Sequence, residues 1–206
     1  IAEYLQKEES VPGEDFLETL RDDFSGEFEF LADKPPALSL EGYLFPDTYE
    51  VSFSAGTRDI VKEMLSNFGR KFTQDLKEET LRQKKTVFEV ITMASLIEKE
   101  VRNLEDKKIV SGILWKRIRV SMPLQVDATV AYITGRKTTK ISTEETKIDS
   151  PYNTYKYPGL PLGPIANPGL ESIKAALYPE SSEYWYYLST PEGETIFSKI
   201  LEEHNI

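Results

Sequence analysis

The chain has 206 residues, of which 29% are charged and 11% aromatic, and this length and composition are typical of one globular domain with a sizeable core. The formal net charge of −10 argues against a nucleic-acid partner and against an anionic membrane surface, because both are bound by clustered Lys and Arg. With no cysteine and a single histidine, His204, the chain excludes disulfides and thiolate metal sites and disfavours a catalytic triad. We therefore expect no metal and no cofactor, and carboxylate chemistry if the protein is an enzyme.

No stretch of the sequence approaches the roughly 18 apolar residues needed to span a bilayer. The chain also begins at Ile1, directly in an amphipathic segment. We therefore expect a soluble fragment of a longer protein, in which a missing part carries any targeting or membrane segment.

The first half of the chain predicts helices around one extended segment. Residues 1 to about 33 favour two or three short helices, closed by Pro35-Pro36. The aromatic-rich segment from Leu40 to Val51 contains Gly and Pro, which indicates extended chain or short strands. An apolar residue at every fourth position then predicts one helix from about Ser54 to Gln83.

Three further helices are expected in the middle of the chain. Thr86 is a plausible N-cap for a helix from Val87 to about Arg102. A second helix is predicted from Lys107 to Arg119, and a short third one from Ala128 to Ile133, where Gly135 stops it. Residues 136–149 are polar and indicate a surface excursion.

The C-terminal part begins with an unusual segment, 150–169, which is rich in Pro, Gly and Tyr. Asn167-Pro168 resembles an N-cap followed by Pro at the first helical position, which predicts a helix to about Leu177. Residues 184–188 and 195–197 are strand candidates that could pair, and 201–204 favour a helix. The expected fold class is α+β, a mainly helical domain whose short strands help to form a cleft.

The helix predicted from Val87 carries three glutamates in different positions. At 100° per residue, Glu98 lies in the middle of an apolar stripe, whereas Glu89 and Glu100 lie on the far side, where we expect solvent. Burying an unpaired carboxylate is costly, and a raised pKa relieves that cost. A carboxyl group that stays protonated near neutral pH can protonate a leaving group, so Glu98 is the candidate general acid.

Two other interpretations of Glu98 stay open from the pattern alone. A glutamate on an apolar stripe can form a structural ion pair with Arg or Lys, and such pairs also perturb pKa values. The helix could also be solvated on both sides at this point. A direct contact between Glu98 and a basic side chain would weaken its candidacy as a proton donor.

The segment around Glu98 is one of several blocks that resemble a known family. In chain order these are Leu40-Glu41-Gly42-Tyr43-Leu44-Phe45-Pro46-Asp47-Thr48-Tyr49, Ala94-Ser95-Leu96-Ile97-Glu98-Lys99-Glu100, Met122-Pro123-Leu124-Gln125-Val126-Asp127-Ala128-Thr129-Val130, Ser150-Pro151-Tyr152-Asn153-Thr154-Tyr155, Gly159 to Gly169 and Phe197 to Asn205. Together they are similar to the endolytic murein transglycosylases, the YceG-like family. The blocks cover residues 40–206, and their shared order makes the resemblance specific.

The resemblance implies an activity and a setting. Members of the family cleave the β-1,4 bond between N-acetylmuramic acid and N-acetylglucosamine without water and leave a 1,6-anhydromuramic acid end. It implies that 1–38 is a helical lead-in and 39–206 the catalytic domain, with a membrane-spanning helix and a LysM-like module outside this sequence. It also implies a glycan-strand substrate, peptidoglycan synthases as partners, and an extracytoplasmic domain on a single-pass bacterial membrane protein.

By motif position, the resemblance places Glu98 at the catalytic glutamate. The expected substrate-binding residues are Glu41, Gln125, Asp127, Thr129, Ser150, Asn153 and Tyr155. Several of these residues could have a local structural role instead of binding substrate. Glu41 could fix its own turn, Asp127 is favoured as a helix cap, and Gln125 and Thr129 could order a turn. The aromatic run 184–187 is more typical of a core strand than of a sugar platform.

Two rival functions have to be distinguished from a lytic enzyme. A non-catalytic glycan-binding module would keep the aromatic and amide groups but would need no protonatable glutamate. An aminodeoxychorismate lyase that depends on pyridoxal phosphate would need a Schiff-base lysine and a phosphate cup. Lys99 is the lysine nearest to the motif, but no Gly-rich phosphate loop accompanies it.

Overall fold

The computed structural model describes residues 1–8, 11–52, 54–136, 141–190 and 193–204. Its elements are α1 (Ala2–Lys7), α2 (Gly13–Thr19), η1 (Glu29–Leu31), α3 (Thr57–Lys71), α4 (Gln74–Arg82), α5 (Val87–Glu100), α6 (Leu104–Arg119), α7 (Asp127–Thr134), η2 (Glu145–Lys147), α8 (Leu170–Leu177), β1 (Tyr186–Ser189), β2 (Thr195–Ser198) and α9 (Leu201–His204). The strands form one antiparallel pair, in which Tyr187 lies opposite Phe197. The predicted α+β class is confirmed.

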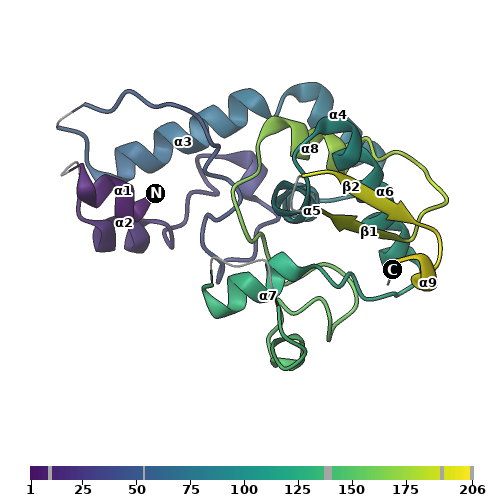
Figure 1. The fold of residues 1–206 in the computed structure, drawn as a ribbon. Coiled ribbons are helices and arrows are strands. Elements are labelled where there is room, and N and C mark those ends of the chain that lie inside the picture. The colour runs from purple at the N-terminus through teal and green to yellow at the C-terminus, as the bar shows by residue number, and fades with distance from the viewer. Residues whose placement is uncertain (9–10, 53, 137–140, 191–192, 205–206) are drawn as a thin grey trace.

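Helix α5 is the central element of the fold. A capping box starts it: the Thr86 N–H donates to the Glu89 carboxylate at 2.8 Å, and the Glu89 N–H donates to the Thr86 hydroxyl at 3.1 Å. All residues from Val90 to Ile97 are buried, because α4, α6, α7 and α8 all contact α5. Figure 1 shows α5 almost end-on, with α8 above it, α7 below it and the β1–β2 hairpin beside it.

The helix predicted from Ser54 to Gln83 is wrong in one respect, because it is two helices. The backbone leaves the helical region at Phe72 and Thr73, between α3 and α4. The repeating apolar residues are nevertheless all buried, namely Ile60, Met64, Phe68, Phe72 and Leu76. A strict four-residue spacing drifts by about 40° per step around a helix, so one straight helix would carry the last of these residues away from the core. The break between α3 and α4 turns the last of these apolar residues back toward the core.

The segment from Leu40 to Val51 forms turns and extended backbone without a strand. This segment is held by side-chain packing and not by strand pairing: Tyr43 is fully buried against Phe30 and Phe68. Gly42 has φ +96°, and a Cβ there would lie 2.6 Å from Pro164, so only glycine fits. This segment is therefore packed closely against the loop that precedes α8.

The start of α8 also differs from the prediction. The N-cap is Gly169, and Asn167 lies outside the helix. The Asn167 side-chain oxygen accepts hydrogen bonds from the N–H groups of Gly42 (2.8 Å) and Leu44 (3.1 Å). Asn167 therefore joins two distant loops and caps no helix. Helices α5, α6, α7 and α9 and both strands lie close to their predicted positions. Residues 137–140 of the polar segment and Asn205 of the last block lie outside the described residues.

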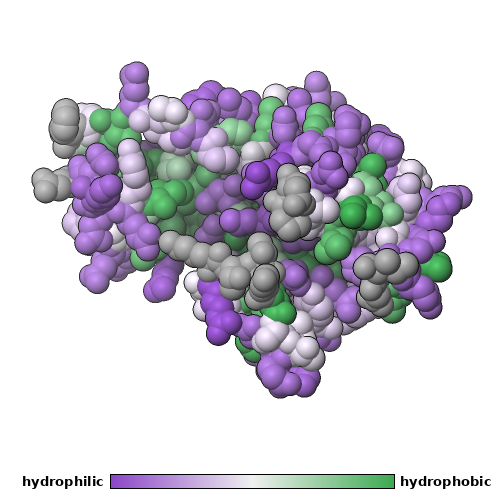
Figure 2. All heavy atoms as spheres, viewed as in Figure 1, coloured by the Kyte–Doolittle hydropathy of each residue, from purple (hydrophilic) through white to green (hydrophobic). Residues whose placement is uncertain are grey.

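Figure 2 shows a mostly hydrophilic surface on the viewed face, with apolar atoms in the recess beside the N-terminal helices and over the β1–β2 hairpin. On the hairpin, the cross-strand pair Leu188 and Ile196 is half exposed. Among the described residues, we find no helix with the length and apolar character required to cross a membrane.

Candidate active site

Two cavities flank the C-terminal end of α5. The larger has a volume of about 1050 Å³, and its lining includes Glu100, Gln125, Asp127, Tyr155, Tyr186 and Tyr187. The smaller, of about 480 Å³, is lined by Glu98, Glu41, Asn167 and others, and Lys99 borders both cavities. Two residues along a helix correspond to a rotation of about 200°, so Glu98 and Glu100 face different cavities.

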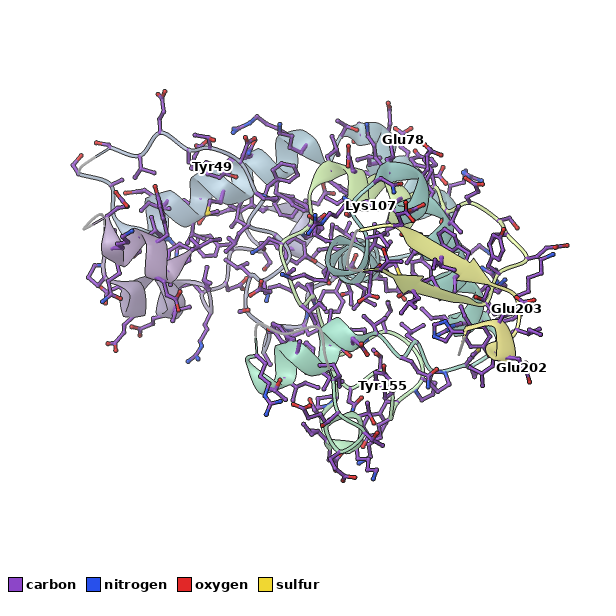
Figure 3. The ribbon with its side chains drawn as sticks, in the orientation of Figure 1. Tyr49, Glu78, Lys107, Tyr155, Glu202 and Glu203 are labelled. Carbon is purple, nitrogen blue, oxygen red and sulfur yellow. The ribbon has the colours of Figure 1, made fainter. Side chains whose placement is uncertain are left out.

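Glu98 is surrounded by donors and a cation. Its Oε2 atom accepts hydrogen bonds from the Ser172 hydroxyl at 2.5 Å and from the Gly169 N–H at 3.2 Å. The ammonium group of Lys107 lies 3.7 Å from the same oxygen and is only 8% exposed. An ionised carboxylate is a pure acceptor, so these partners match its charged form. Figure 3 labels Lys107 beside the end of α5, where α6 and α8 approach it.

Glu100 has a different environment. It is half-buried against β1, where the Tyr187 hydroxyl donates to its Oε2 atom at 2.9 Å and the Ser189 hydroxyl donates to its carbonyl oxygen at 3.1 Å. Burial, with a smaller contribution from the nearby negative charge of Asp127, raises the pKa of Glu100 to about 7. The Tyr187 hydroxyl and the Ala128 N–H lower the pKa and only partly offset this. Glu100 can therefore hold and release a proton near neutral pH.

Arg117, the buried basic residue of the larger cavity, is bound to groups other than Glu100. The buried guanidinium of Arg117 lines the larger cavity, but it donates to the carbonyl oxygens of Trp185 (2.7 and 3.0 Å) and Leu124 (2.7 Å). Within the described part of the chain, every ion pair of Lys or Arg is made with an acidic residue other than Glu100. Among the described residues, the carboxyl group of Glu100 thus has no ion-pair partner like the Lys107 of Glu98.

Asp127 is the second carboxylate of the larger cavity. It is the first residue of α7, whose N-cap is Val126, so the expected capping role is wrong. Its carboxylate instead accepts a hydrogen bond from the Tyr155 hydroxyl. Figure 3 shows Tyr155 in the loop segment below α7. Burial raises the pKa of Tyr155 well above its usual value, so this phenol remains a donor at neutral pH.

Five of the predicted site residues line a cavity. Gln125, Asp127 and Tyr155 meet around the larger one, although the sequence separates them by up to 30 residues. Glu98 and Glu41 line the smaller one. Burial raises the pKa of Glu41, whose carboxyl group accepts a hydrogen bond from the Asn167 amide at 3.4 Å.

The other three predicted residues lie outside both cavities and support the fold. Asn153 is buried, and its amide donates to the carbonyl oxygens of Thr146 (3.0 Å) and Ile148 (2.7 Å). The buried Thr129 hydroxyl donates to Val126 O at 2.7 Å. The Ser150 hydroxyl accepts from the Tyr152 N–H at 3.3 Å. The polar groups of these three residues bond to the protein itself, in α7 and in residues 146–153. That they contact the substrate directly stays a prediction.

At two points on α5 the structure differs from what the sequence predicts. Glu98 has a basic neighbour, and Glu100 faces a protein-lined cavity where solvent was expected. The helix is apolar on all sides, so one apolar stripe cannot identify the buried face. A signal was available: Met93 and Leu96, both fully buried, precede Glu100 by seven and four residues and share its face. Tyr187 and Arg117 are cavity residues that the sequence analysis missed.

The described residues contain no group of three or more His, Cys, Asp or Glu side chains arranged to hold a metal ion.

Comparisons with known proteins agree on one family. The model of the YceG-like family matches residues 1–206. An endolytic murein transglycosylase of Bacillus subtilis is 41% identical over 167 residues, which covers 81% of this chain and 46% of that protein. One from Streptococcus pneumoniae is 36% identical over 173 residues, covering 81% of this chain and 31% of that protein. The crystal structure of a YceG-like protein from Listeria monocytogenes superposes with a TM-score of 0.87 at 35% identity, covering 98% of this chain and 69% of that one.

Proposed function

Because the chain belongs to the YceG-like family, we propose that it is the catalytic part of a murein-cleaving lytic transglycosylase, with Glu100 as its general acid and base. The chain spans less than half the length of the curated relatives, which are named endolytic murein transglycosylases. The assignment of Glu100 rests on its place in the larger cavity, where its half-buried carboxyl group accepts a hydrogen bond from the Tyr187 hydroxyl. Burial there raises its pKa to about 7, which supports the assignment.

The proposed reaction needs one group that first donates and then accepts a proton. Protonated Glu100 gives its proton to the glycosidic oxygen while the bond from that oxygen to C1 of N-acetylmuramic acid breaks. The 6-hydroxyl oxygen of the same sugar then bonds to C1, and its proton passes to the Glu100 carboxylate. No water is consumed, and Glu100 ends in its starting form. A pKa near the working pH is best suited to both steps.

The other cavity groups support the binding of a sugar strand. Tyr186 and Tyr187 are consecutive residues of β1 that both line the cavity, and Tyr132, 41% exposed, lines it too. Phenol groups offer both a stacking face and a hydroxyl to a sugar ring. Gln125 adds an exposed side chain at the cavity, held on a backbone with φ +52°. We propose Gln125, Asp127 and Tyr155 as substrate-binding residues on this ground.

Glu98 is the second candidate for the acid, because the motif resemblance places it there and it lines a cavity of its own. Its contact with Lys107 and its two hydrogen-bond donors disfavour it as a proton donor. We propose instead that Glu98 is a structural anion that joins α5 to α8. We further propose that the domain acts outside the cytoplasmic membrane, where murein lies; a membrane anchor and synthase partners stay predictions.

The test is the digestion of purified murein, followed by mass analysis of the products. The proposal predicts muropeptides with 1,6-anhydro ends, which are lighter by one water than hydrolysis products. In the Glu100→Gln variant, the rate should fall at least about 100-fold, the lower range for loss of general acid catalysis. Reducing ends would indicate a hydrolase, and binding of murein without cleavage would favour a non-catalytic glycan-binding module.

A further inference from the structure

Lys99 lies between the two cavities at the end of α5. It stands between Glu98 and Glu100 in the last turn of the helix and, like Ile165, lines both the larger and the smaller cavity. Its side chain is exposed, whereas the two glutamates beside it are half-buried. The ammonium group of Lys99 can therefore contact a ligand in either cavity, whichever of the two glutamates donates the proton.

The other cationic side chains of the larger cavity are bound to protein groups. Arg117 donates to backbone carbonyl oxygens, and Arg136 pairs with Glu145 at 2.7 Å. The lining of the smaller cavity contains no Lys or Arg besides Lys99 among the described residues. Within the same part of the chain, Lys99 forms no ion pair. Its charge is thus available to a ligand.

The walls of both cavities are acidic. Carboxyl groups line them, namely those of Glu41, Asp47, Glu98, Glu100 and Asp127. Burial raises the pKa of Glu41, and the positive charge of Lys99 is among the smaller effects that lower it, so this charge acts within the smaller cavity. Carboxylate walls repel an anionic ligand, and an ammonium group between the two cavities offsets that repulsion at one point.

A murein strand differs from a neutral sugar polymer in its acidic side arms. Its backbone is that of chitin, but every second sugar carries a lactyl ether, which ends in a carboxylate or in a stem peptide that bears carboxylates of its own. A site that binds the neutral sugar rings alone needs no cation. A site that also binds the side arm needs a group of opposite charge beside the rings.

We propose that Lys99 is a specificity-determining residue that distinguishes murein from a neutral glycan, through an ion pair between its ammonium group and a carboxylate of the side arm. The inference rests on the proposed function for its choice of murein as the ligand. The side-arm carboxylate binds between the two cavities, while the sugar rings contact the tyrosines of the larger cavity.

The test uses two tetrasaccharides of alternating N-acetylglucosamine and N-acetylmuramic acid, one with free lactyl carboxylates and one with these converted to neutral methyl amides. Binding is followed by NMR of lysine side chains at low temperature, where turnover is slow, and Lys99→Gln assigns the Lys99 signal. The native protein should bind the carboxylate form about tenfold more tightly, the lower range for a hydrogen bond to a charged group. The Lys99 signal should move with this form and not with the amide.

The variants separate binding from stability, because a lysine in the last turn of a helix also stabilises that helix. Lys99→Gln should bind both tetrasaccharides as weakly as the native protein binds the amide, and Lys99→Arg should keep most of the preference. The matched control is Lys174→Gln, which removes an exposed lysine from the last turn of α8, outside the lining of both cavities, and should leave the preference unchanged. Thermal unfolding checks the fold of each variant.

A third ligand, the same tetrasaccharide with stem peptides, distinguishes the two sources of the carboxylate. A preference that depends on Lys99 for this ligand alone assigns the ion pair to the peptide, and one already present with the free lactyl group assigns it to the sugar; both support the proposal. Equal affinity of the native protein for all three ligands overturns it, and so does an equal loss for all three in Lys99→Gln. If the native protein releases no anhydro products, the proposed function fails, whereas the binding preference still decides the role of Lys99.

Discussion

The two sides of the C-terminal turn of α5 give the same residue type opposite surroundings. Glu98 faces Gly169, at the start of α8, and Lys107, whereas Glu100 faces a strand and a second carboxylate. Both lie in the last turn of their own helix, where the helix dipole disfavours a negative charge. On the Glu98 side, the N-terminus of α8 and an ammonium group compensate for this. On the Glu100 side, burial and the negative charge of Asp127 disfavour an ionised carboxylate further.

The position of a glutamate in a motif therefore does not by itself determine its surroundings. Both residues stand in the same heptapeptide, and both line a cavity. They differ in the charge of the group beside them: Lys107 lies near Glu98, and Asp127 acts on Glu100. Hydrogen-bond donors and a cation lie beside Glu98, whereas burial and a second carboxylate raise the pKa of Glu100.

The largest effect on stability is expected from matched substitutions of the two glutamates at pH 8. Glu98→Gln should destabilise the protein by about 1–3 kcal/mol, because a neutral amide then faces Lys107 and two donors. Glu100→Gln should stabilise it, by up to about 3 kcal/mol for a pKa shift from 4.5 to about 7. Urea unfolding followed by circular dichroism measures both.

The pH dependence sharpens this contrast. Below about pH 4.5 Glu100 is protonated in the folded and unfolded chains, so Glu100→Gln should have little effect there. As the pH rises to about 7, the unfolded chain loses this proton first, and the native protein loses stability that the variant keeps. A stabilisation that is equal at pH 4 and pH 8 would show that Glu100 titrates normally.

A smaller effect is expected from Asn153→Ala, which tests how the wall of the larger cavity is built. The amide of Asn153 makes two donor bonds and accepts from the Tyr155 N–H at 3.0 Å, all in a buried setting. Its loss should cost about 2 kcal/mol of unfolding free energy. If Asn153 bound the sugar directly, KM would rise strongly at temperatures where the variant is fully folded; we expect only a modest rise.

The smallest effect is expected from Gln125→Gly. Gln125 holds φ +52°, a left-handed conformation that costs a residue other than glycine about 1 kcal/mol. Glycine should therefore raise the unfolding free energy by up to that amount, while loss of the amide at the cavity should raise KM for glycan. Ser121→Gly, at φ +57° and outside the lining of the larger cavity, is the control that should gain stability without a change in KM.

Much of the fold was predictable because local signals agreed with tertiary packing. Thr86 and Glu89 form the capping box that starts α5, and Gly135 ends α7 with φ +69°. The β1–β2 pairing followed from two short apolar runs. Asn167 was misread, because its local resemblance to a helix cap was overridden by two backbone donors more than 120 residues away.

The candidate site was predictable only in part, for a physical reason. The blocks of the family resemblance identified Gln125, Asp127 and Tyr155, and the fold brings these to one cavity. Periodicity could not choose between Glu98 and Glu100, because residues 90–97 of α5 are buried around the whole helix and each glutamate lines a cavity. The choice depends on Lys107 and Tyr187, which come from elements that no local pattern connects to α5.

The central claim is tested most directly by measuring the release of anhydro-muropeptides from purified murein by Glu98→Gln and Glu100→Gln side by side, each at a temperature where the variant is fully folded. The account predicts that Glu98→Gln retains activity within about tenfold of the native protein, while Glu100→Gln loses at least about 100-fold. The reverse result, with Glu98→Gln inactive and Glu100→Gln active, would contradict it and return the role of proton donor to Glu98.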